Sequence, residues 1–397
     1  MEYHLPAGFQ LSGVHCGLKR RSQRHDTSLI YCPEPASAAG VYTQNQVVAA
    51  PVLLDQLRTP TEDFRALIIN SGNANACTGE QGMRDAVRMT ELTGEVCGVS
   101  ADGCLVMSTG IIGVPLPMEL IERGIREAQP QLGSSPEHVA AAAEGMLTTD
   151  TVSKVASHKL DIRGQSCSLL GMAKGSGMIG PNMATMLAVI MTDARIDSTT
   201  AQRLLSRAAL ESFNCIHVDG HTSTNDSVVL LSSGVATDQP LSDEDEVWFA
   251  EHLRDVCIDL AKRIVDDGEG ATHLIEITVG GCQTWADAYL IGQAVGGSPL
   301  VKTAIAGADP NWGRIVSAAG YAGPAFDPNG VDLRLNGTLL YQNGTPVDFD
   351  PEAVSTSIRD NRETTIELQL SEGEATARYW ACDLTKEYVS INADYHT

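Results

Sequence analysis

Residues 174–187 read KGSGMIGPNMATML, a loop with three glycines and one proline that runs into an apolar segment beginning at Thr185. Glycine adopts backbone conformations that other residues avoid, and proline interrupts regular structure, so this loop is the sharpest local break along the chain. The apolar run 186–191 has the composition of a buried strand. The sequence therefore predicts a Gly-rich loop directly before a core strand.

Elements of both kinds flank this loop. Apolar, β-branched stretches predict strands at 66–70, 104–107, 186–191, 227–231, 274–279, 331–335, 365–370 and 375–382. Helical periodicity predicts helices over 86–96, 136–143, 199–213, 243–265 and 300–306. This mixture indicates a layered α+β fold of mixed α/β layers, and the sequence carries no repeat of 20–50 residues.

The composition is that of an ordinary folded protein of 397 residues, 43% hydrophobic and 19% charged. A formal net charge of −23 argues against a surface that neutralises nucleic-acid phosphates. The apolar runs are far shorter than the roughly 20 residues that span a bilayer. Residues 1–10 (MEYHLPAGFQ) lack the basic and apolar regions of a secretory leader. We therefore expect a soluble, cytoplasmic protein without nucleic-acid or membrane partners.

Ten cysteines are spread from Cys16 to Cys382 without a C-x-x-C pair and without clustering near histidine. This spacing indicates neither a zinc site nor a disulfide framework. We expect reduced, mostly buried thiols and no bound metal.

Two interpretations of the Gly-rich loop follow from its composition. It can be a turn between two strands. Alternatively, Gly175, Gly177 and Gly180 match the G-x-G-x-x-G pattern of dinucleotide-binding loops. That motif requires a helix that begins within the glycines, whereas Pro181 and the run 188–191 predict a strand. The dinucleotide interpretation therefore has only the glycine spacing in its favour.

The run GMIGPNMATML (177–187) is similar to the self-processing segment of the ornithine acetyltransferase family, whose members cleave one of their own Ala-Thr bonds. In this chain the bond joins Ala184 and Thr185. Gly180 departs from the alanine or larger residue expected there. Similar blocks extend the resemblance over essentially the whole chain: IINSGNANACTG (68–79), STGIIG (108–113), TTDT (148–151), TSTND (222–226), DGEGA (267–271), SPLVKT (298–303), DPNWGRI (309–315) and DLTKEYVSINADYHT (383–397).

The resemblance implies that Thr185 is the nucleophile. A threonine hydroxyl needs a base to take its proton, and cleavage before Thr185 frees an α-amine with a pKa near ~8 that can serve. The Thr185 hydroxyl can also make the cut by attacking the Ala184 carbonyl, after which water hydrolyses the ester. The products are an α chain, 1–184, and a β chain, 185–397, whose structural domains interdigitate across the cut.

The remaining site residues are implied by the same resemblance. Thr109 and Gly110 match the oxyanion hole, although a capped glycine turn would leave the same pattern. The substrate-binding positions are Thr148, Lys174, Thr185, Glu269, Asn392 and Thr397. Without the resemblance, Lys174 would be a solvated lysine and Glu269 part of a solvated helix end.

The implied reaction is a ping-pong transfer of acetyl from N2-acetylornithine to glutamate in arginine biosynthesis. It needs no cofactor, and some family members also take acetyl from acetyl-CoA. The implied fold is an αββα-type sandwich with a smaller C-terminal domain, assembled from two α and two β chains.

Other functions stay open at this stage. Transfer of the acyl group to water would make an amidase or aminopeptidase with the same nucleophile. A family member of a specialised pathway would share every catalytic residue. A dinucleotide-binding protein without activity would remain one uncut chain.

Overall fold

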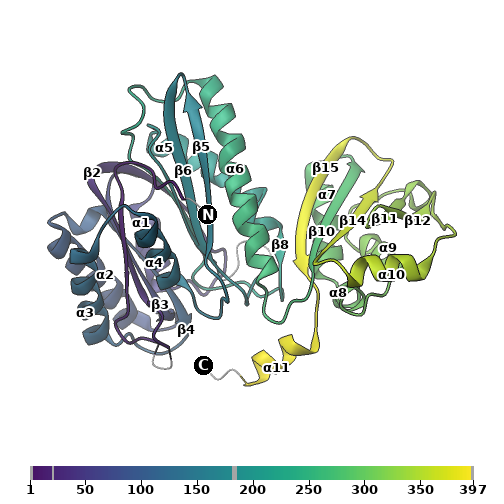
Figure 1. The fold of residues 1–397 in the computed structure, drawn as a ribbon, viewed down its shortest axis with the longest axis horizontal. Helices are drawn as coiled ribbons and strands as arrows, with labels where there is room; N and C mark the ends of the chain where they lie inside the picture. The colour runs from purple at the N-terminus through teal and green to yellow at the C-terminus, as the bar shows by residue number, and fades with distance from the viewer. Residues whose placement is uncertain (1–2, 20–21, 181–185, 395–397) are drawn as a thin grey trace.

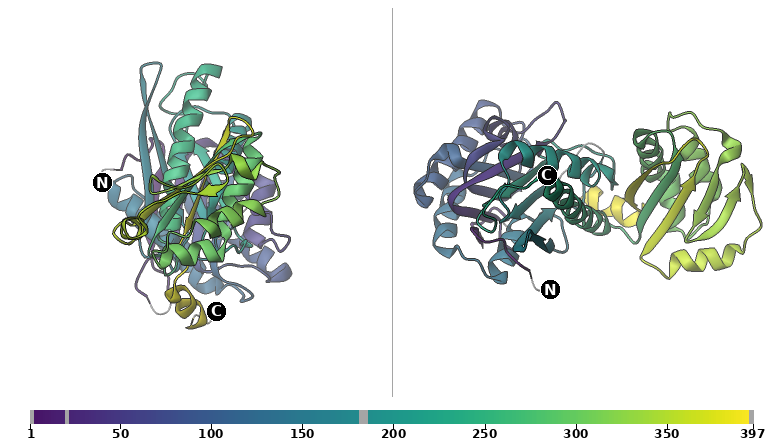
Figure 2. Two further views of the ribbon diagram at one scale, coloured as in Figure 1. Left: turned by 90° about the vertical axis from the view of Figure 1, so that its right-hand side faces the viewer. Right: turned by 90° about the horizontal axis from the view of Figure 1, so that it is seen from above.

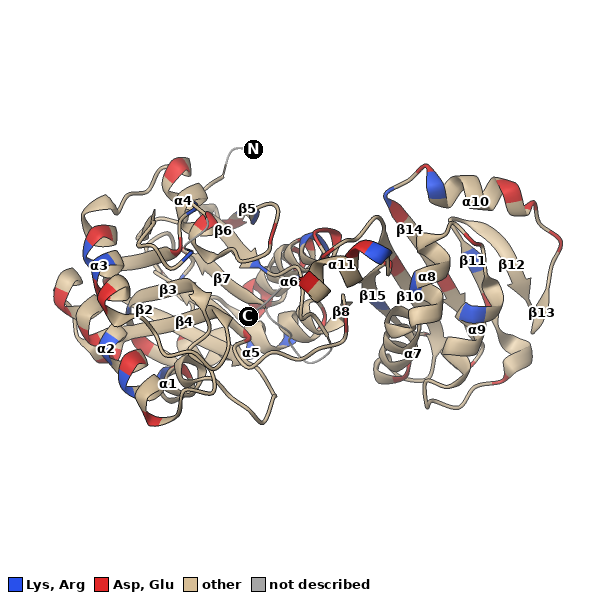
Figure 3. Cartoon of the chain, turned by 90° about the horizontal axis from the view of Figure 1, so that it is seen from below, with Lys and Arg blue, Asp and Glu red and all other residues tan. Residues whose placement is uncertain are grey.

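The chain forms two lobes in a computed structural model that describes residues 3–19, 22–180 and 186–394 (Figure 1). Over these residues the N-terminal lobe is built on an eight-stranded sheet and the C-terminal lobe on a seven-stranded sheet. Seen from above, the two sheets lie side by side, and the last helix, α11 (Lys386–Asp394), lies between the lobes (Figure 2). Lys and Arg are interspersed with Asp and Glu on both lobes (Figure 3).

The strands of the N-terminal sheet lie in the order β4-β3-β2-β9-β7-β6-β5, and β1 pairs with β2. The sheet is mixed, because β2 is antiparallel to β3 and β9 whereas β3 is parallel to β4 and β7 is parallel to β9. The bounds are β1 Gln10–Val14, β2 Thr27–Tyr42, β3 Thr61–Asn73, β4 Cys104–Ile111, β5 Lys154–Ile162, β6 Gln165–Lys174, β7 Leu187–Thr192 and β9 Ser227–Ser232.

The long strand β2 divides this sheet into two facing halves. Its pairing with β3 shifts between Tyr31 and Ala36, and residues 37–42 pair with β9 on the other side. Such an irregularity bends and twists a strand. Leu67 of β3 and Val189 of β7 lie on different halves yet belong to one buried cluster. The halves therefore pack against each other around a shared core.

Helices cover the outer face of each half, because side chains alternate along a strand. Ile68 of β3 points outward and packs with α1, α2 and α3, while Ile190 of β7 packs with α5 and α6. These outer helices are α1 Ala50–Arg58, α2 Gly79–Cys97, α3 Met118–Ala128, α5 Ser198–Leu210 and α6 Asp243–Asp266. Helix α4 (Pro136–Met146) instead packs with the inner cluster that the two halves share. The layers run helix, sheet, sheet, helix, which confirms the αββα sandwich expected from the family resemblance.

The C-terminal lobe is smaller and has its sheet in the order β13-β12-β11-β14-β10-β15-β8. Its strands are β8 Ile216–His217, β10 Leu274–Cys282, β11 Asp332–Leu335, β12 Thr338–Gln342, β13 Thr345–Pro346, β14 Glu363–Gln369 and β15 Ala375–Cys382. Its helices are α7 Trp285–Gly297, α8 Pro299–Ala306, α9 Trp312–Gly320 and α10 Pro351–Arg359. Over the whole described chain, short 3-10 turns span Ala101–Gly103, Gln129–Gln131, Phe213–Cys215 and Pro328–Gly330.

Every strand and helix predicted from the sequence overlaps an element of the same type. The ends agree within five residues except at α2, which begins at Gly79 instead of the predicted residue 86. The hairpin of β5 and β6 was missed because its residues mix polar and apolar types. Helix α7 was missed because it is rich in glycine. Two of those glycines are required by packing, since a Cβ on Gly292 or Gly296 would lie 3.1 or 2.8 Å from Tyr379.

The dinucleotide interpretation is wrong. The Gly-rich loop follows β6, and the next element among the described residues is strand β7 rather than a helix whose N-terminus could meet a pyrophosphate. Of the ten cysteines all are free, and Cys77 alone is exposed. Within the described part of the chain, none of the helices is long and apolar enough to cross a membrane.

Candidate functional site

The start of β7 is tied to the start of β9 by a buried carboxylate. Asp226 precedes β9, is fully buried, and accepts the backbone N–H of Met186 at 2.9 Å through Oδ1. Its other oxygen, Oδ2, has no hydrogen-bond partner in the described structure. Met186 directly follows Thr185 in the chain. Asp226 therefore fixes the backbone next to the residue expected to be the nucleophile.

The preceding residue holds the end of β4 to the same point. The side-chain amide of Asn225 donates to the carbonyl of Ala74 at 2.6 Å and to that of Ser108 at 2.9 Å. Ser108 precedes Thr109, so two adjacent side chains connect the expected oxyanion-hole strand to Met186. Because buried hydrogen bonds fix the backbone at Ser108 and at Met186, the groups next to these residues are held in a defined geometry relative to each other.

Thr109 and Gly110 end β4 with features that a ligand-facing turn needs. Thr109 is 1% exposed, and its hydroxyl has no hydrogen-bond partner among the described residues. Gly110 has φ 134°, and a Cβ there would lie 2.3 Å from the carbonyl carbon of Gly72. Only glycine fits this position without strain. The turn thus has an unpartnered hydroxyl beside a backbone that comes unusually close to β3.

A cavity of about 690 Å³ opens beside this turn. Gly110 and Thr148 both line it, which brings an expected oxyanion-hole residue and an expected substrate-binding residue together. A volume of this size is typical of small-molecule sites. Its other walls come from the ends of β3 and β4 and from the loop before β2: Gly17, Leu18, Lys19, Ser22, Arg24, Gly72, Asn73, Ile111, Val114, Pro115, Pro117, Leu120 and Thr149.

Lys174, at the end of β6, is 2% exposed. Burial lowers the pKa of its ammonium group, and the charge of Asp150 opposes that shift. Asp150 accepts the N–H of Gly175 at 2.7 Å and that of Thr148 at 3.0 Å. One carboxylate thus binds the Gly-rich loop to the segment that carries Thr148.

Asp150 also belongs to a buried group of three charges. Lys154 lies 2.7 Å from Asp150 and 2.6 Å from Asp267, and its side chain is fully buried. Burial on its own would raise the pKa of the Asp150 carboxyl, but the cations of Lys174 and Lys154 outweigh it and hold that pKa below its usual range. Asp267 in turn accepts the N–H of Thr151 at 3.0 Å. These contacts hold the turn after α6 against residues 148–154.

That turn places Glu269 against the Gly-rich loop. The Glu269 N–H donates to the carbonyl of Ser176 at 2.9 Å, and a Cβ on Gly177 would lie 2.5 Å from the Glu269 carboxylate carbon. Asn392 of α11 donates to Glu269 Oε2 at 3.0 Å. A smaller cavity of about 260 Å³ lies here, lined by Glu269 and Thr149 among others. Because Thr149 also lines the larger cavity, the two cavities adjoin at this residue.

The structure therefore brings most expected site residues into one region. Gly110 and Thr148 line the larger cavity, with Thr109 buried next to Gly110 in β4. Lys174, Glu269 and Asn392 lie around the Gly-rich loop. Ala184, Thr185 and Thr397 lie outside the described residues.

Sequence reasoning missed the residues that connect these groups, namely Asp150, Lys154, Asn225, Asp226 and Asp267. The blocks TTDT, TSTND and DGEGA contain four of them, so a signal existed. Lys154 had none, because a single lysine at the start of a strand does not reveal a partner 113 residues away.

The Asp226 carboxyl has an unusual protonation equilibrium. Burial raises its pKa to about 8, although the amide of Met186 and the cation of Lys174 both lower it. Within the described ranges there is no group of three His, Cys, Asp or Glu side chains arranged to hold a metal ion.

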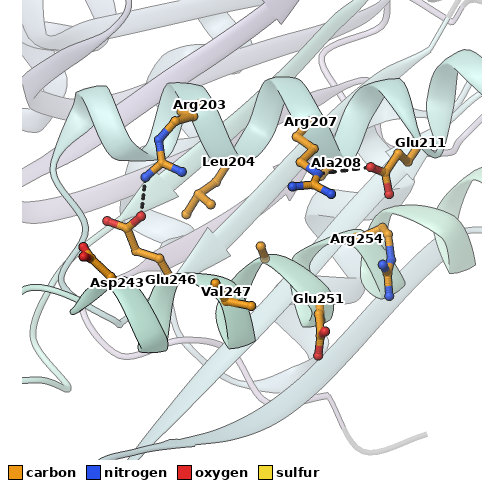
Figure 4. A pocket seen from close by; sticks show the side chains of 11 residues that line it. Arg203, Leu204, Arg207, Ala208, Glu211, Asp243, Glu246, Val247, Glu251 and Arg254 are labelled. Carbon is orange, nitrogen blue, oxygen red and sulfur yellow. Dashed lines mark hydrogen bonds and ion pairs between the residues drawn. The ribbon is translucent and has the colours of Figure 1, made fainter. Parts of the chain in front are cut away.

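A separate cavity of about 390 Å³ lies between α5 and α6 and is lined by none of the expected site residues (Figure 4). Its three cations are already paired, Arg203 with Glu246, Arg207 with Glu211 and Arg254 with Asp255. We therefore assign the candidate site to the region around the Gly-rich loop.

Comparisons with known proteins identify the family of the chain. The chain matches the ArgJ family over residues 10–397. It is 46% identical to the arginine biosynthesis bifunctional protein ArgJ of Rhodopirellula baltica over 99% of this chain and 96% of that protein. It is 46% identical to the protein of the same name from Thermotoga neapolitana over 99% of this chain and 100% of that one. A crystal structure of ArgJ from Bacillus halodurans superposes with a TM-score of 0.50 and 42% identity, covering 51% of this chain and 96% of the solved one. The chain belongs to the ArgJ family of arginine biosynthesis enzymes.

Proposed function

We propose that the enzyme cuts its own chain between Ala184 and Thr185 and then moves acetyl from N2-acetylornithine to glutamate through an acetyl-Thr185 intermediate. The observation that carries this proposal is the pair of contacts from Asn225 and Asp226. They hold Ser108, which precedes the oxyanion-hole candidates, and Met186, which follows Thr185, at one place in the fold.

In the first half-reaction the Thr185 hydroxyl attacks the acetyl carbonyl of N2-acetylornithine and gives its proton to its own α-amine. The tetrahedral intermediate then expels the amine of ornithine, which takes that proton. In the second half-reaction the amine of glutamate attacks the acetyl ester and Thr185 leaves as the free hydroxyl. The acyl energy is conserved in the ester, so the cycle requires neither a metal nor a nucleotide.

The oxyanion of each tetrahedral intermediate needs hydrogen-bond donors. The Thr109 hydroxyl, which has no partner in the described structure, and the Gly110 N–H are our candidates. A donor fixed at such a position contributes about 3 kcal/mol of transition-state stabilisation. The Thr109 hydroxyl is buried, so it can donate without first losing a bond to solvent.

Substrate binding is assigned to charged and polar groups around the Gly-rich loop. Lys174 is the candidate partner for the substrate carboxylate and Glu269 for an ammonium group. Thr148, Asn392 and Thr397 complete the set implied by the family resemblance. We further propose acetyl-CoA as a second acetyl donor, in keeping with the bifunctional name of the relatives.

Self-cleavage is supported by two observations. The solved Bacillus halodurans chain matches over 96% of its own length but covers 51% of this chain, close to the length of one predicted fragment. The ion pairs from Asp150 through Lys154 to Asp267 connect residues on both sides of the predicted cut, so the fragments are expected to stay together. We propose that two α and two β chains form the assembly.

Intact-mass measurement and N-terminal sequencing of the wild type beside Thr185→Ala test this function. We expect wild-type fragments 1–184 and 185–397, an acetyl adduct on Thr185 after incubation with N2-acetylornithine, and neither in the variant. A wild-type chain that stays whole and takes no acetyl group would refute the proposal. An adduct that passes to water faster than to glutamate would instead identify an amidase.

A further inference from the structure

The larger cavity has an outer wall that is built around one buried carboxylate. Asp26 is fully buried and accepts backbone N–H groups from four residues of the loop that precedes β2. The donors are Cys16 at 2.7 Å, Gly17 at 3.0 Å, Leu18 at 2.8 Å and Lys19 at 3.3 Å. Four amides on one carboxylate give this part of the loop a defined shape.

The loop lies directly against the candidate oxyanion hole. A Cβ on Gly72 would lie 3.3 Å from the Cβ of Leu18, and Gly72 is also the residue that Gly110 approaches most closely. Gly72 itself has φ 117°. Side chains of this loop therefore line the cavity next to Gly110 and face the space that a bound substrate would occupy.

Two of these side chains are cations. Lys19 and Arg24 both line the cavity, and each donates to a backbone carbonyl, Lys19 to His25 at 2.5 Å and Arg24 to Asp150 at 3.0 Å. Asp26, Glu144 and Asp150 lie near enough to attract the Lys19 ammonium electrostatically, but neither cation forms an ion pair within 4.0 Å among the described residues. A chain of net charge −23 offers many carboxylates, yet these two cations face a cavity instead.

The adjoining cavity has the opposite character. Its acids Asp266 and Asp267 are paired with Arg362 and Lys154 respectively, at 2.8 and 2.6 Å. The third acid there, Glu269, accepts a hydrogen bond from the side-chain amide of Asn392 at 3.0 Å. The two cavities thus meet at Thr149, with the cations Lys19 and Arg24 in the wall of one and the carboxylate of Glu269 in the wall of the other.

We propose that Lys19 and Arg24 form an anion subsite that takes the distal acidic group of a substrate, in the first place the side-chain carboxylate of glutamate. This inference rests on the proposed function. Ornithine and glutamate share their α-carbon groups and differ in the charge at the far end, so one pocket of single sign cannot suit both. Two separate subsites of opposite charge can suit both substrates, because each subsite repels the end group of the other substrate.

A phosphate of acetyl-CoA has the same anionic chemistry and would also suit guanidinium and ammonium groups. The two sources are distinguished by which substrate loses affinity. Glutamate carries the carboxylate alone, and acetyl-pantetheine is an acetyl donor that lacks the nucleotide phosphates.

The test is steady-state kinetics of the processed enzyme with Lys19→Ala, Arg24→Ala and the double variant. Loss of a charge-assisted hydrogen bond is expected to raise KM for glutamate about tenfold or more, with formation of acetyl-Thr185 from N2-acetylornithine unchanged within about twofold. The matched control is Arg126→Ala with Lys159→Ala, which removes the same charges from exposed positions that line neither cavity.

Each outcome is decisive. A higher KM for glutamate supports the carboxylate, and a higher KM for acetyl-CoA but not for acetyl-pantetheine supports the phosphate as occupant of the same subsite. Unchanged KM values for glutamate, acetyl-CoA and acetyl-pantetheine in a folded double variant overturn the inference. If Lys19→Ala does not fold, Arg24→Ala alone decides the test, because Arg24 is exposed. Failure of the wild type to form acetyl-Thr185 would count against the proposed function instead.

Discussion

Asp150 and Asp226 are both buried carboxylates of the same site, but their surroundings differ. Asp150 accepts two backbone amides and lies 2.7 Å from Lys154, so both of its oxygens have partners. Asp226 has one amide on Oδ1 and no partner on Oδ2 in the described structure. Burial raises the pKa of both carboxyls, and only around Asp150 do nearby cations reverse that effect.

The contrast extends to their neighbours. The region of Asp150 consists of ion pairs whose members all have partners, which is an arrangement that holds chain segments together. The region of Asp226 includes Thr109, whose hydroxyl is also buried without a partner. Unpartnered buried oxygens cost stability and are retained where a reaction uses them. We therefore expect changes near Asp150 to affect stability and changes near Thr109 to affect catalysis.

The largest expected effect is that of Lys154→Met. The variant leaves Asp150 and Asp267 buried without their cation, which is expected to lower the free energy of unfolding by about 3–5 kcal/mol. Denaturant unfolding followed by circular dichroism measures it. Lys159→Met on the exposed side of β5 is the control, with a change of less than about 0.5 kcal/mol. A loss no larger than that of the control would show that the ion pairs do not hold this region.

Thr109→Val tests the other side of the comparison. It removes a hydroxyl without a partner, so the free energy of unfolding is expected to change by less than about 1 kcal/mol. The acetyl-transfer kcat is expected to fall about 100-fold, because one oxyanion donor is lost. Thr93→Val should behave in the opposite way, since its buried hydroxyl donates to Met89 at 2.7 Å, away from the site. Equal stability losses in both variants would remove the distinction between the two regions.

Much of the fold was predictable because local patterns determine it. The continuous apolar runs of β3 and β7 and the helical periodicity of α2 are properties of consecutive residues, and each predicted the correct element. The αββα arrangement required the family resemblance, since the bend in β2 that makes two halves depends on pairing with strands on either side. Hydrophobic periodicity alone predicted only that helices and strands form a layered α/β structure.

The candidate site was predictable only where its residues carry a motif. Thr109, Gly110 and Thr148 follow from blocks that resemble the family, and the structure places Gly110 and Thr148 in the wall of one cavity. The contacts of Asp226 with Met186 and of Lys154 with Asp267 join residues 40 and 113 positions apart. Such long-range pairs are consequences of tertiary packing, and no spacing in the sequence indicates them.

The effect that is smallest over any one pH unit is a difference in the pH dependence of stability, measured with Asp226→Asn in the Thr185→Ala background so that both proteins are single chains. A folded pKa of about 8, above the ordinary value of about 4, means that the folded state binds the extra proton between these pH values. Asp226 then contributes stability below pH ~4 that is lost as the pH rises through 8, with a slope of at most about 1.4 kcal/mol per unit.

The asparagine variant cannot ionise, and it keeps an oxygen to accept the N–H of Met186. Its unfolding free energy should therefore match that of the parent at acidic pH and exceed it increasingly toward pH 8. Asp150 has the opposite sign, because its lowered pKa gives stability that is present above pH ~4 and lost only as the pH falls below it. Parallel pH profiles for the parent and Asp226→Asn would mean that Asp226 is ionised in the fold, and the contrast between the two carboxylates would then rest on their contacts alone.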